Sequence, residues 1–235
     1  MELPEITPEL SVLLKEVDTP TVCNAVETAQ GKRGFDQFTR SPVTPADPNL
    51  PAFFGIARTA RICGSRPPSG PPETAKEQRL AYYRYMAEPT LPRIAVIEDI
   101  DEEPIGAFWG EVNTTVHKGL GVSGVLTNGL VRDLGDVAPG FQVLAGGVGP
   151  SHYFVHVVEI DMPVNVLGLK VNPGDFIHAD RHGAAVVPPE ILPELADAIR
   201  QMQEGEQLVI GPAKEPGFDI AALEKAWEAF ENARS

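Results

Sequence analysis

The sequence has few of the features that mark secreted, membrane-bound or nucleotide-binding proteins. Its only cysteines, Cys23 and Cys63, are far apart and form no CxxC pair, which excludes a disulfide framework and favours a reducing compartment. No apolar run approaches the roughly 18 residues that a membrane-spanning helix needs. The first ten residues, MELPEITPEL, carry no signal-peptide pattern. We therefore expect a cytoplasmic protein.

Basic residues are also scarce. The chain has 19 Lys and Arg against 33 Asp and Glu, for a formal net charge of -14. Binding to nucleic acid or to an anionic membrane surface requires clustered basic side chains, so neither is an expected partner. The glycine cluster Gly146–Pro150 lacks the GxGxxG spacing of dinucleotide-binding loops, and no P-loop lysine is present. The acidic residues are spread along the chain, and this is typical of a soluble surface.

The composition is that of a globular α/β protein. With 235 residues and 43% hydrophobic content, the chain reads as one domain over 1–235. Helices are expected at 6–30, 76–87, from about 107, 189–208 and 219–233. Strands are expected at 55–62, 93–98, 124–127, 142–145, 154–160, 163–171 and 175–187. The proline-rich segment 64–76 has no periodicity and is expected to be a loop or lid.

One acidic residue, Glu111, stands at the expected start of the central helix, whose apolar stripe would be Phe108, Val112, Val116 and Leu120. A first-turn acid is favoured by the helix dipole alone, and this is its simplest interpretation. However, Gly110 would let a ligand approach the backbone, and the unpaired N–H groups at the start of the helix would face that ligand. A small carboxylate is the ligand that suits this position.

A second pair, Arg132-Asp133, follows an apolar run and the turn at Gly129. Such a pair is commonly a surface ion pair or a helix cap. In α/β proteins, however, ligand sites gather where strands end, and an arginine fork suits a carboxylate or an enolate oxygen. The adjacent aspartate suits a hard divalent metal.

The other candidate residues carry weaker signals. Two histidine pairs, His152/His156 and His178/His182, have HxxxH spacing, but neither pair falls in an expected helix, so a zinc site is not expected. His178 and His182 flank a short turn, and they either line a pocket or stabilise that turn. There is no GxSxG motif, and neither cysteine has an activating context.

The spacing between Glu111 and Arg132-Asp133, with twenty residues between them, resembles the signature of a known family. That family, the RraA-like proteins, joins class II 4-hydroxy-4-methyl-2-oxoglutarate aldolases and regulators of ribonuclease activity A. The matching segments are Trp109–Glu111, Gly121–Val125, Asn128–Asp133, Pro163-Val164, Val171–Asp175 and His178–Gly183. The resemblance covers roughly residues 15–210.

The resemblance implies an α-β-β-α sandwich similar to the swivelling phosphohistidine domain, assembled as a homotrimer or a dimer of trimers. It places active sites between subunits, so that segments 1–30 and 189–235 are expected at subunit contacts. A glutamate from a neighbouring subunit's C-terminal helix would complete each site, and Glu206 or Glu204 would have this role.

The resemblance also implies roles for residues near the central helix. Asp133 would bind Mg²⁺ or Mn²⁺, and Glu111 would hold a metal-bound water. Arg132 would contact the keto or enolate oxygen of a small 2-oxo acid. The substrate carboxylate would lie on the backbone of Gly110, Glu111, Val112 and Asn113.

The activity implied is that of a metal-dependent lyase. Retro-aldol cleavage or decarboxylation of a 2-oxo acid leaves a pyruvate enolate, whose charge must be stabilised. Aldolase activity on 4-hydroxy-4-methyl-2-oxoglutarate and oxaloacetate decarboxylase activity both proceed this way. The alternative is a non-catalytic regulator that binds a ribonuclease; relatives of that kind tend to lack the metal-binding acid, whereas this chain has Asp133. A quinone methyltransferase is disfavoured by the missing nucleotide pattern.

Two departures from the family pattern concern the same region. Asn128-Gly129 stands where the family usually has Asp-Gly, and Val112-Asn113-Thr114 replaces a usual Leu-Ala pattern. Asn113 is expected to add polarity near the carboxylate site. Together with the proline-rich segment and His152, these differences favour a substrate other than the best-known one.

Overall fold

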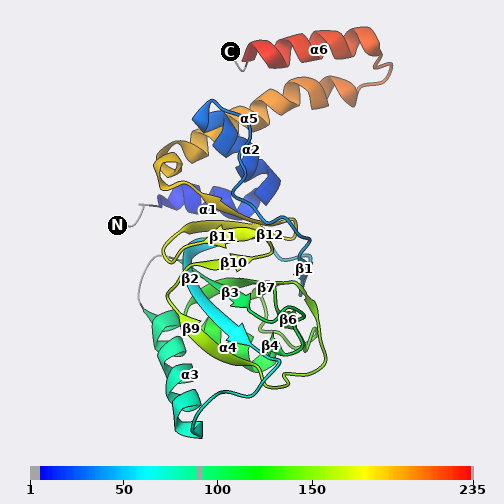
Figure 1. Ribbon diagram of the computed structural model, residues 1–235. Helices are drawn as coiled ribbons and strands as arrows, with labels where there is room; N and C mark the ends of the chain where they lie inside the picture. The colour runs from blue at the N-terminus through cyan, green and yellow to red at the C-terminus, as the bar shows by residue number, and fades with distance from the viewer. Residues whose placement is uncertain (1–5, 89–91, 234–235) are drawn as a thin grey trace.

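The computed structural model describes residues 6–88 and 92–233, shown in Figure 1. The helices are α1 (Pro8–Glu16), α2 (Thr19–Gln30), α3 (Pro72–Ala87), α4 (Glu111–Gly119), α5 (Leu192–Ala213) and α6 (Ile220–Ala233), with a 3-10 turn η1 (Pro189–Ile191). The strands are β1 (Thr44–Pro45), β2 (Phe53–Cys63), β3 (Arg93–Asp99), β4 (Ala107–Trp109), β5 (Val122–Thr127), β6 (Leu130–Val131), β7 (Gln142–Ala145), β8 (Gly147–Val148), β9 (His156–Ile160), β10 (Val164–Val166), β11 (Leu169–Val171), β12 (Phe176–Asp180) and β13 (Gly183–Val187).

A curled, mixed sheet forms the centre of the molecule. Its strands run in the order β1-β7-β5-β3-β2-β12-β13, and β9 pairs with β2. Strands β7, β5, β3 and β2 are parallel to one another, so their carboxyl ends share one edge. The long β2 and β3 are almost entirely buried, as expected for parallel strands covered on both faces.

Different layers cover the two faces of this sheet. On one face, α3, α4 and a small parallel sheet, β4-β6-β8, pack around Trp109, Tyr82 and Phe141. On the other face, the β10–β11 hairpin packs on Ile94 and Leu126. Two helical segments lie far from α4 in Figure 1: α1 and α2 with the start of α5 pack beside β12 and β13, and α6 extends beyond them.

The N-terminal segment, expected to be helical over 6–30, forms two helices, α1 and α2. Thr7 caps α1 by accepting a hydrogen bond from the Leu10 N–H at 3.1 Å, with proline next in the chain. Asp18 caps α2 in the same way, through the Thr21 N–H at 2.9 Å. Local capping residues therefore account for where both helices begin.

Several expected boundaries are wrong. The central helix begins at Glu111 and not near Ala107, because Ala107–Trp109 is buried and pairs with β6 as strand β4. Val112 is 66% exposed and does not belong to an apolar stripe; Thr114 and His117 are the buried positions of α4. The segment expected as one strand at 163–171 is a hairpin, with Leu167 and Gly168 at positive φ.

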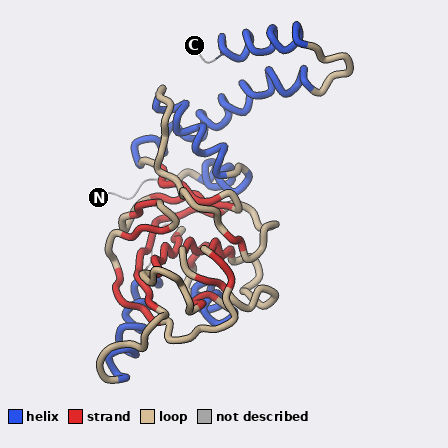
Figure 2. The backbone as a smooth tube through the Cα atoms, turned by 45° about the vertical axis from the view of Figure 1, so that its right-hand side comes forward, coloured by secondary structure: helices blue, strands red, loops and turns tan. Residues whose placement is uncertain are grey.

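The C-terminal helices also differ from expectation. Helix α5 runs to Ala213, through Gly211-Pro212, instead of ending near 208. Pro212 lies in the final turn, where its missing N–H costs one intrahelical bond only. Both views show α5 and α6 as an antiparallel pair of helices projecting from the rest of the molecule (Figures 1 and 2). Across the described residues, no helix combines the length and the apolar character needed to cross a membrane.

Candidate functional site

The candidate site is a corner where β4 ends, α4 begins and β6 ends. We call it the α4 corner and define it by Gly110, Glu111, Arg132 and Asp133. The Arg132 N–H donates to the Trp109 carbonyl at 2.8 Å, which holds the ends of β6 and β4 together. Residues 22 apart in sequence therefore meet because two short parallel strands end side by side.

Gly110 allows this approach. A Cβ at position 110 would lie 2.4 Å from Asp133 Oδ2 and 3.0 Å from Arg132 Cγ, so the Asp133 carboxylate would have to shift to make room for it. Its backbone is extended, so the requirement for glycine is one of space and not of dihedral angles. The approach expected at this glycine was that of a ligand and stays a prediction; the groups that the structure brings against Gly110 are the Arg132 and Asp133 side chains.

Asp133 is held in an unusual conformation. Its φ is +55°, in the left-handed region that aspartate tolerates better than most residues. One turn contact, from the Asp136 N–H to the Asp133 carbonyl at 2.9 Å, supports this geometry. The strain points the carboxylate at the start of α4, where Oδ2 accepts the Glu111 N–H at 3.2 Å.

Arg132 and Asp133 form an ion pair and remain accessible. Arg132 Nη1 lies 2.9 Å from Asp133 Oδ2 and 3.1 Å from Oδ1, and the two side chains are 30% and 31% exposed. Arg132 Nε is buried and has no hydrogen-bond partner among the described residues. Because the side chain is partly exposed, the guanidinium can still donate a hydrogen bond to an oxygen ligand beside the Asp133 carboxylate.

The first turn of α4 supplies further donors. Helix geometry leaves the N–H groups of Val112 and Asn113 without an acceptor inside the helix, whereas the Thr114 N–H already reaches the Gly110 carbonyl. The Glu111 side chain is exposed. These groups lie next to Asp133, and the free N–H groups at a helix start are donors that an anion can use.

The expectation that the Asn113 side chain adds polarity near the carboxylate site is wrong. Its Nδ2 donates to the Phe108 carbonyl at 2.6 Å, and its Oδ1 accepts from the Tyr83 hydroxyl at 2.8 Å. The side chain therefore ties α4 to β4 and α3. Only the backbone N–H of Asn113 remains available to a ligand.

A second network at the same sheet edge was not found from the sequence. The Asn128 amide donates to the Asp99 carbonyl at 2.7 Å and accepts the Asp99 N–H at 2.8 Å. An aspartate at 128 could accept but not donate when ionised, which explains how asparagine fits here. Asp99 Oδ2 is buried without a partner among the described residues, and burial raises the pKa of Asp99 to about 6.

The loop after β2 is anchored by Asp101. Its carboxylate accepts the N–H groups of Gly64 and Ser65 at 2.6 and 2.8 Å, and also the Ser65 hydroxyl. Burial acts to raise the pKa of Asp101, but these hydrogen bonds outweigh it and the pKa is lowered. The loop expected at 64–76 is shorter than predicted, because helix α3 already begins at Pro72.

Glu204 and Glu206 lie away from the α4 corner of their own chain. Both are on α5, which Figures 1 and 2 place at the opposite end of the molecule from α4. Glu206 faces a cavity shared with Asn24 and Phe230. A role in a neighbouring subunit's site stays a prediction.

The donor set of the α4 corner fits a hard divalent cation bound largely by water and substrate. No cluster of three or more His, Cys, Asp and Glu side chains within residues 6–88 and 92–233 is arranged to hold a metal. The carboxylate of Asp133 is the accessible acidic ligand that the corner holds in place. Mg²⁺ commonly binds through one or two carboxylates and keeps several waters.

The fold and this corner define a mixed α/β protein with a candidate site at the carboxyl edge of its parallel strands. The family model described as "RraA-like: Aldolase/RraA" matches residues 19–186. The chain therefore belongs to the RraA-like family, which includes both aldolases and ribonuclease inhibitors. The family and the fold expected from the sequence are confirmed.

Individual relatives are distant. An uncharacterized protein of Methanocaldococcus jannaschii is 35% identical over 105 residues, which are 44% of this chain and 50% of that protein. A putative 4-hydroxy-4-methyl-2-oxoglutarate aldolase of Halalkalibacterium halodurans is 25% identical over 177 residues, covering 74% and 78% of the two chains. The crystal structure of Streptomyces coelicolor RraAS2, described as an unusual member of the RNase ES inhibitor RraA family, has a TM-score of 0.66 at 24% identity. That alignment covers 88% of this chain and 97% of RraAS2, and it shows a shared fold.

Proposed function

We propose that this chain is a divalent-metal-dependent lyase acting on a small 2-oxo acid, by retro-aldol cleavage or decarboxylation. The observation that carries the proposal is the position of the Asp133 carboxylate. It is held at positive φ beside the Arg132 guanidinium and the open first turn of α4. The relative named as a putative 4-hydroxy-4-methyl-2-oxoglutarate aldolase supports the reaction class.

The residues of the corner have complementary roles in this proposal. Asp133 would hold Mg²⁺ or Mn²⁺, which when bound polarises the keto oxygen of the substrate. The N–H groups of Val112 and Asn113 would bind the substrate carboxylate. Arg132 would turn its fork from Asp133 toward the oxygen that gains negative charge as the carbon–carbon bond breaks.

Glu111 is placed to move a proton. Its carboxylate is exposed at the first position of α4, next to the substrate's proposed location. A water held by Glu111 would deliver or take up the proton that balances cleavage. In an assembled homotrimer or dimer of trimers, Glu206 or Glu204 of a neighbour would add a second carboxylate to the same space.

The test is pyruvate release from oxaloacetate and from 4-hydroxy-4-methyl-2-oxoglutarate, with Mg²⁺ or Mn²⁺ and with EDTA. A protein-free blank corrects for decarboxylation by the metal alone. We expect Asp133→Asn to lower metal-stimulated turnover by about 10²-fold or more, as loss of a central electrostatic group does. The matched control is Asp136→Asn, an exposed aspartate three residues away whose side chain is outside the corner.

Retained turnover in Asp133→Asn would refute the lyase. Should that variant and the wild type instead bind and inhibit a ribonuclease equally, the non-catalytic alternative would replace it. Equal loss in Asp136→Asn would show that charge removal anywhere near this turn is responsible.

A further inference from the structure

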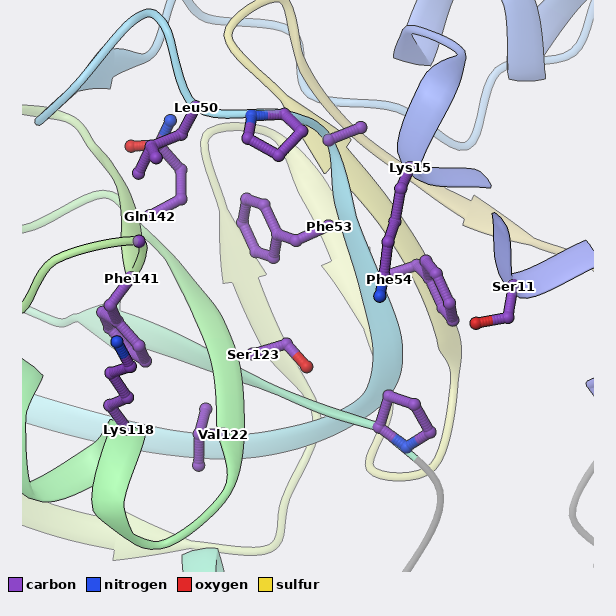
Figure 3. Close-up of a pocket in the computed structure, with 14 residues that line it drawn as sticks. Ser11, Lys15, Leu50, Phe53, Phe54, Lys118, Val122, Ser123, Phe141 and Gln142 are labelled. Atoms are coloured by element: carbon purple, nitrogen blue, oxygen red, sulfur yellow. The ribbon is translucent and has the colours of Figure 1, made fainter. Parts of the chain in front are cut away.

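A second cavity lies at the opposite edge of the parallel sheet from the α4 corner. It has a volume of about 400 Å³ and is bounded by the starts of β2, β5 and β7 and by α1. Figure 3 shows its lining, which includes Lys15, Phe53, Phe54, Ser123, Phe141 and Gln142. We call it the amino-edge pocket. Its volume is within the range of small-molecule sites.

The apolar part of this pocket is preformed. Phe53, Phe54 and Phe141 are at most 7% exposed and belong to the packed core. The Phe53 ring lies against Gly124, where a Cβ would be 2.6 Å from Cε2, so the backbone of β5 fixes the ring's position. A ligand entering the pocket would meet a rigid aromatic surface and would not have to order it.

Two of the polar side chains around the pocket are already used. The Gln142 amide donates to the Asp47 carbonyl at 2.7 Å, and the Lys118 ammonium donates to the Pro139 carbonyl. Lys15 and Ser123 are different, because their side chains make no hydrogen bond or ion pair with any described residue. In Figure 3 the Lys15 amine and the Ser123 hydroxyl both reach into the space beside Phe53 and Phe54.

The charge of the pocket is opposite to that of the protein. The chain has a formal net charge of -14, yet two lysines and no aspartate or glutamate line the cavity within the described residues. Lys118 donates one hydrogen bond to the Pro139 carbonyl, whereas the Lys15 ammonium has no partner among the described residues. Neither an arginine fork nor a helix N-terminus, the usual partners of phosphate, lines the space.

We propose that the amino-edge pocket binds a monocarboxylate with a compact apolar body. The carboxylate would pair with the Lys15 ammonium and accept the Ser123 hydroxyl, and the body would lie against Phe53. Lys15 belongs to α1 and Ser123 to β5, so occupation would link the N-terminal helix to the central sheet. This site is separate from the α4 corner and does not depend on the proposed lyase activity.

Calorimetric titration of the full chain with 2-naphthoate tests the proposal. Two comparison ligands separate its parts: 2-naphthamide lacks the charge, and acetate lacks the apolar body. We expect one naphthoate per chain, weaker binding of both comparison ligands, and an affinity lowered about tenfold in Lys15→Gln, as for a lost charged hydrogen bond. Ser123→Ala should cause a smaller loss.

Two matched variants control the experiment. Lys170→Gln removes the same charge from an exposed position of β11, outside the pocket, and should bind as the wild type does. Asp133→Asn should also bind normally, which separates this site from the lyase proposal. The inference is overturned if naphthoate does not bind, including because a second copy covers the pocket. Equal affinity in Lys15→Gln, or equal affinity for the amide, overturns it as well.

Discussion

Two corners of this molecule use buried polar groups in opposite ways. In one, His178 lies fully buried between α1, α2 and β12, where Nδ1 is 3.1 Å from Thr19 Oγ1 and Nε2 is 2.8 Å from the Leu14 carbonyl. We call this the histidine corner. In the α4 corner, Arg132 Nε is buried without a hydrogen-bond partner among the described residues, and the backbone of Asp133 is held at positive φ.

The difference separates polar groups that hold the fold from those that are free to bind. Both ring nitrogens of His178 are satisfied, so the residue stabilises the packing of two helices and has no capacity left for a ligand. The α4 corner keeps donors and a carboxylate accessible, at a local cost in stability, and these are the groups that the proposed function uses. Substitutions in the two corners should therefore affect different properties.

The largest expected effect is on activity, in Gly110→Ala. The added Cβ would displace Asp133 and Arg132, and a misplacement of about 1 Å in a catalytic group can cost about 10²-fold in rate. We expect a loss of this size in metal-stimulated pyruvate release, with secondary structure retained by circular dichroism. Gly119→Ala, on the same helix, is the control, because the added Cβ would meet no neighbouring atom within 4 Å. Full activity in Gly110→Ala would remove the distinction between the corners.

The next effect is on stability, in His178→Gln. The glutamine amide has a donor and an acceptor but sits on a flexible chain in place of the rigid ring, so the bonds to Thr19 and the Leu14 carbonyl are weakened; one unsatisfied buried group costs about 1–3 kcal/mol. Burial lowers the pKa of His178, so below about pH 6.5 the unfolded chain takes up a proton that the folded chain does not. Wild-type stability should therefore fall as the pH drops, and the deficit of the variant should shrink.

Urea unfolding of the wild type and the His178 variant at about pH 8 and pH 5 measures this difference in the free energy of unfolding. Turnover per folded molecule should be the same in both. A deficit that grows on acidification would contradict the assignment of His178 as a buried neutral group.

The smallest effect concerns Asp99, where the sign of the pH dependence is reversed. Burial raises the pKa of Asp99 to about 6, so between that pH and the ordinary aspartate value of 3.8 the folded chain holds a proton that the unfolded chain has released. Relative to Asp99→Asn, the wild type should gain stability as the pH falls from about 7.5 to 5. Asp136→Asn, at an exposed site, should show no such trend in the same urea titrations.

Local signals predicted much of the fold. The segment expected as one strand at 175–187 is the hairpin of β12 and β13, whereas the helical N-terminal segment and the buried β2 and β3 follow from capping residues or from hydrophobic pattern. The strand β4 did not, because Ala107–Trp109 is only three residues long and pairs with a strand more than twenty residues away. Short apolar runs do not distinguish strand from helix without knowledge of their partners.

The same limit applies to the candidate site. The motif spacing identified Gly110, Glu111, Arg132 and Asp133, and the structure brings them together. It gave no indication that Asp99 and Asn128 are paired, because that contact depends on β3 and β5 being neighbours in the sheet. Contacts between side chains on adjacent strands require the register of the sheet, which a single sequence does not contain.

The central claim is that Asp133 holds a divalent metal beside an anion-binding helix start. A crystal structure of the protein with Mn²⁺ and pyruvate, using anomalous scattering to locate manganese, tests it most directly. We predict an anomalous peak coordinated by the Asp133 carboxylate, with the pyruvate carboxylate on the N–H groups of Val112 and Asn113. Manganese bound elsewhere, with Asp133 still paired only to Arg132, would contradict the account.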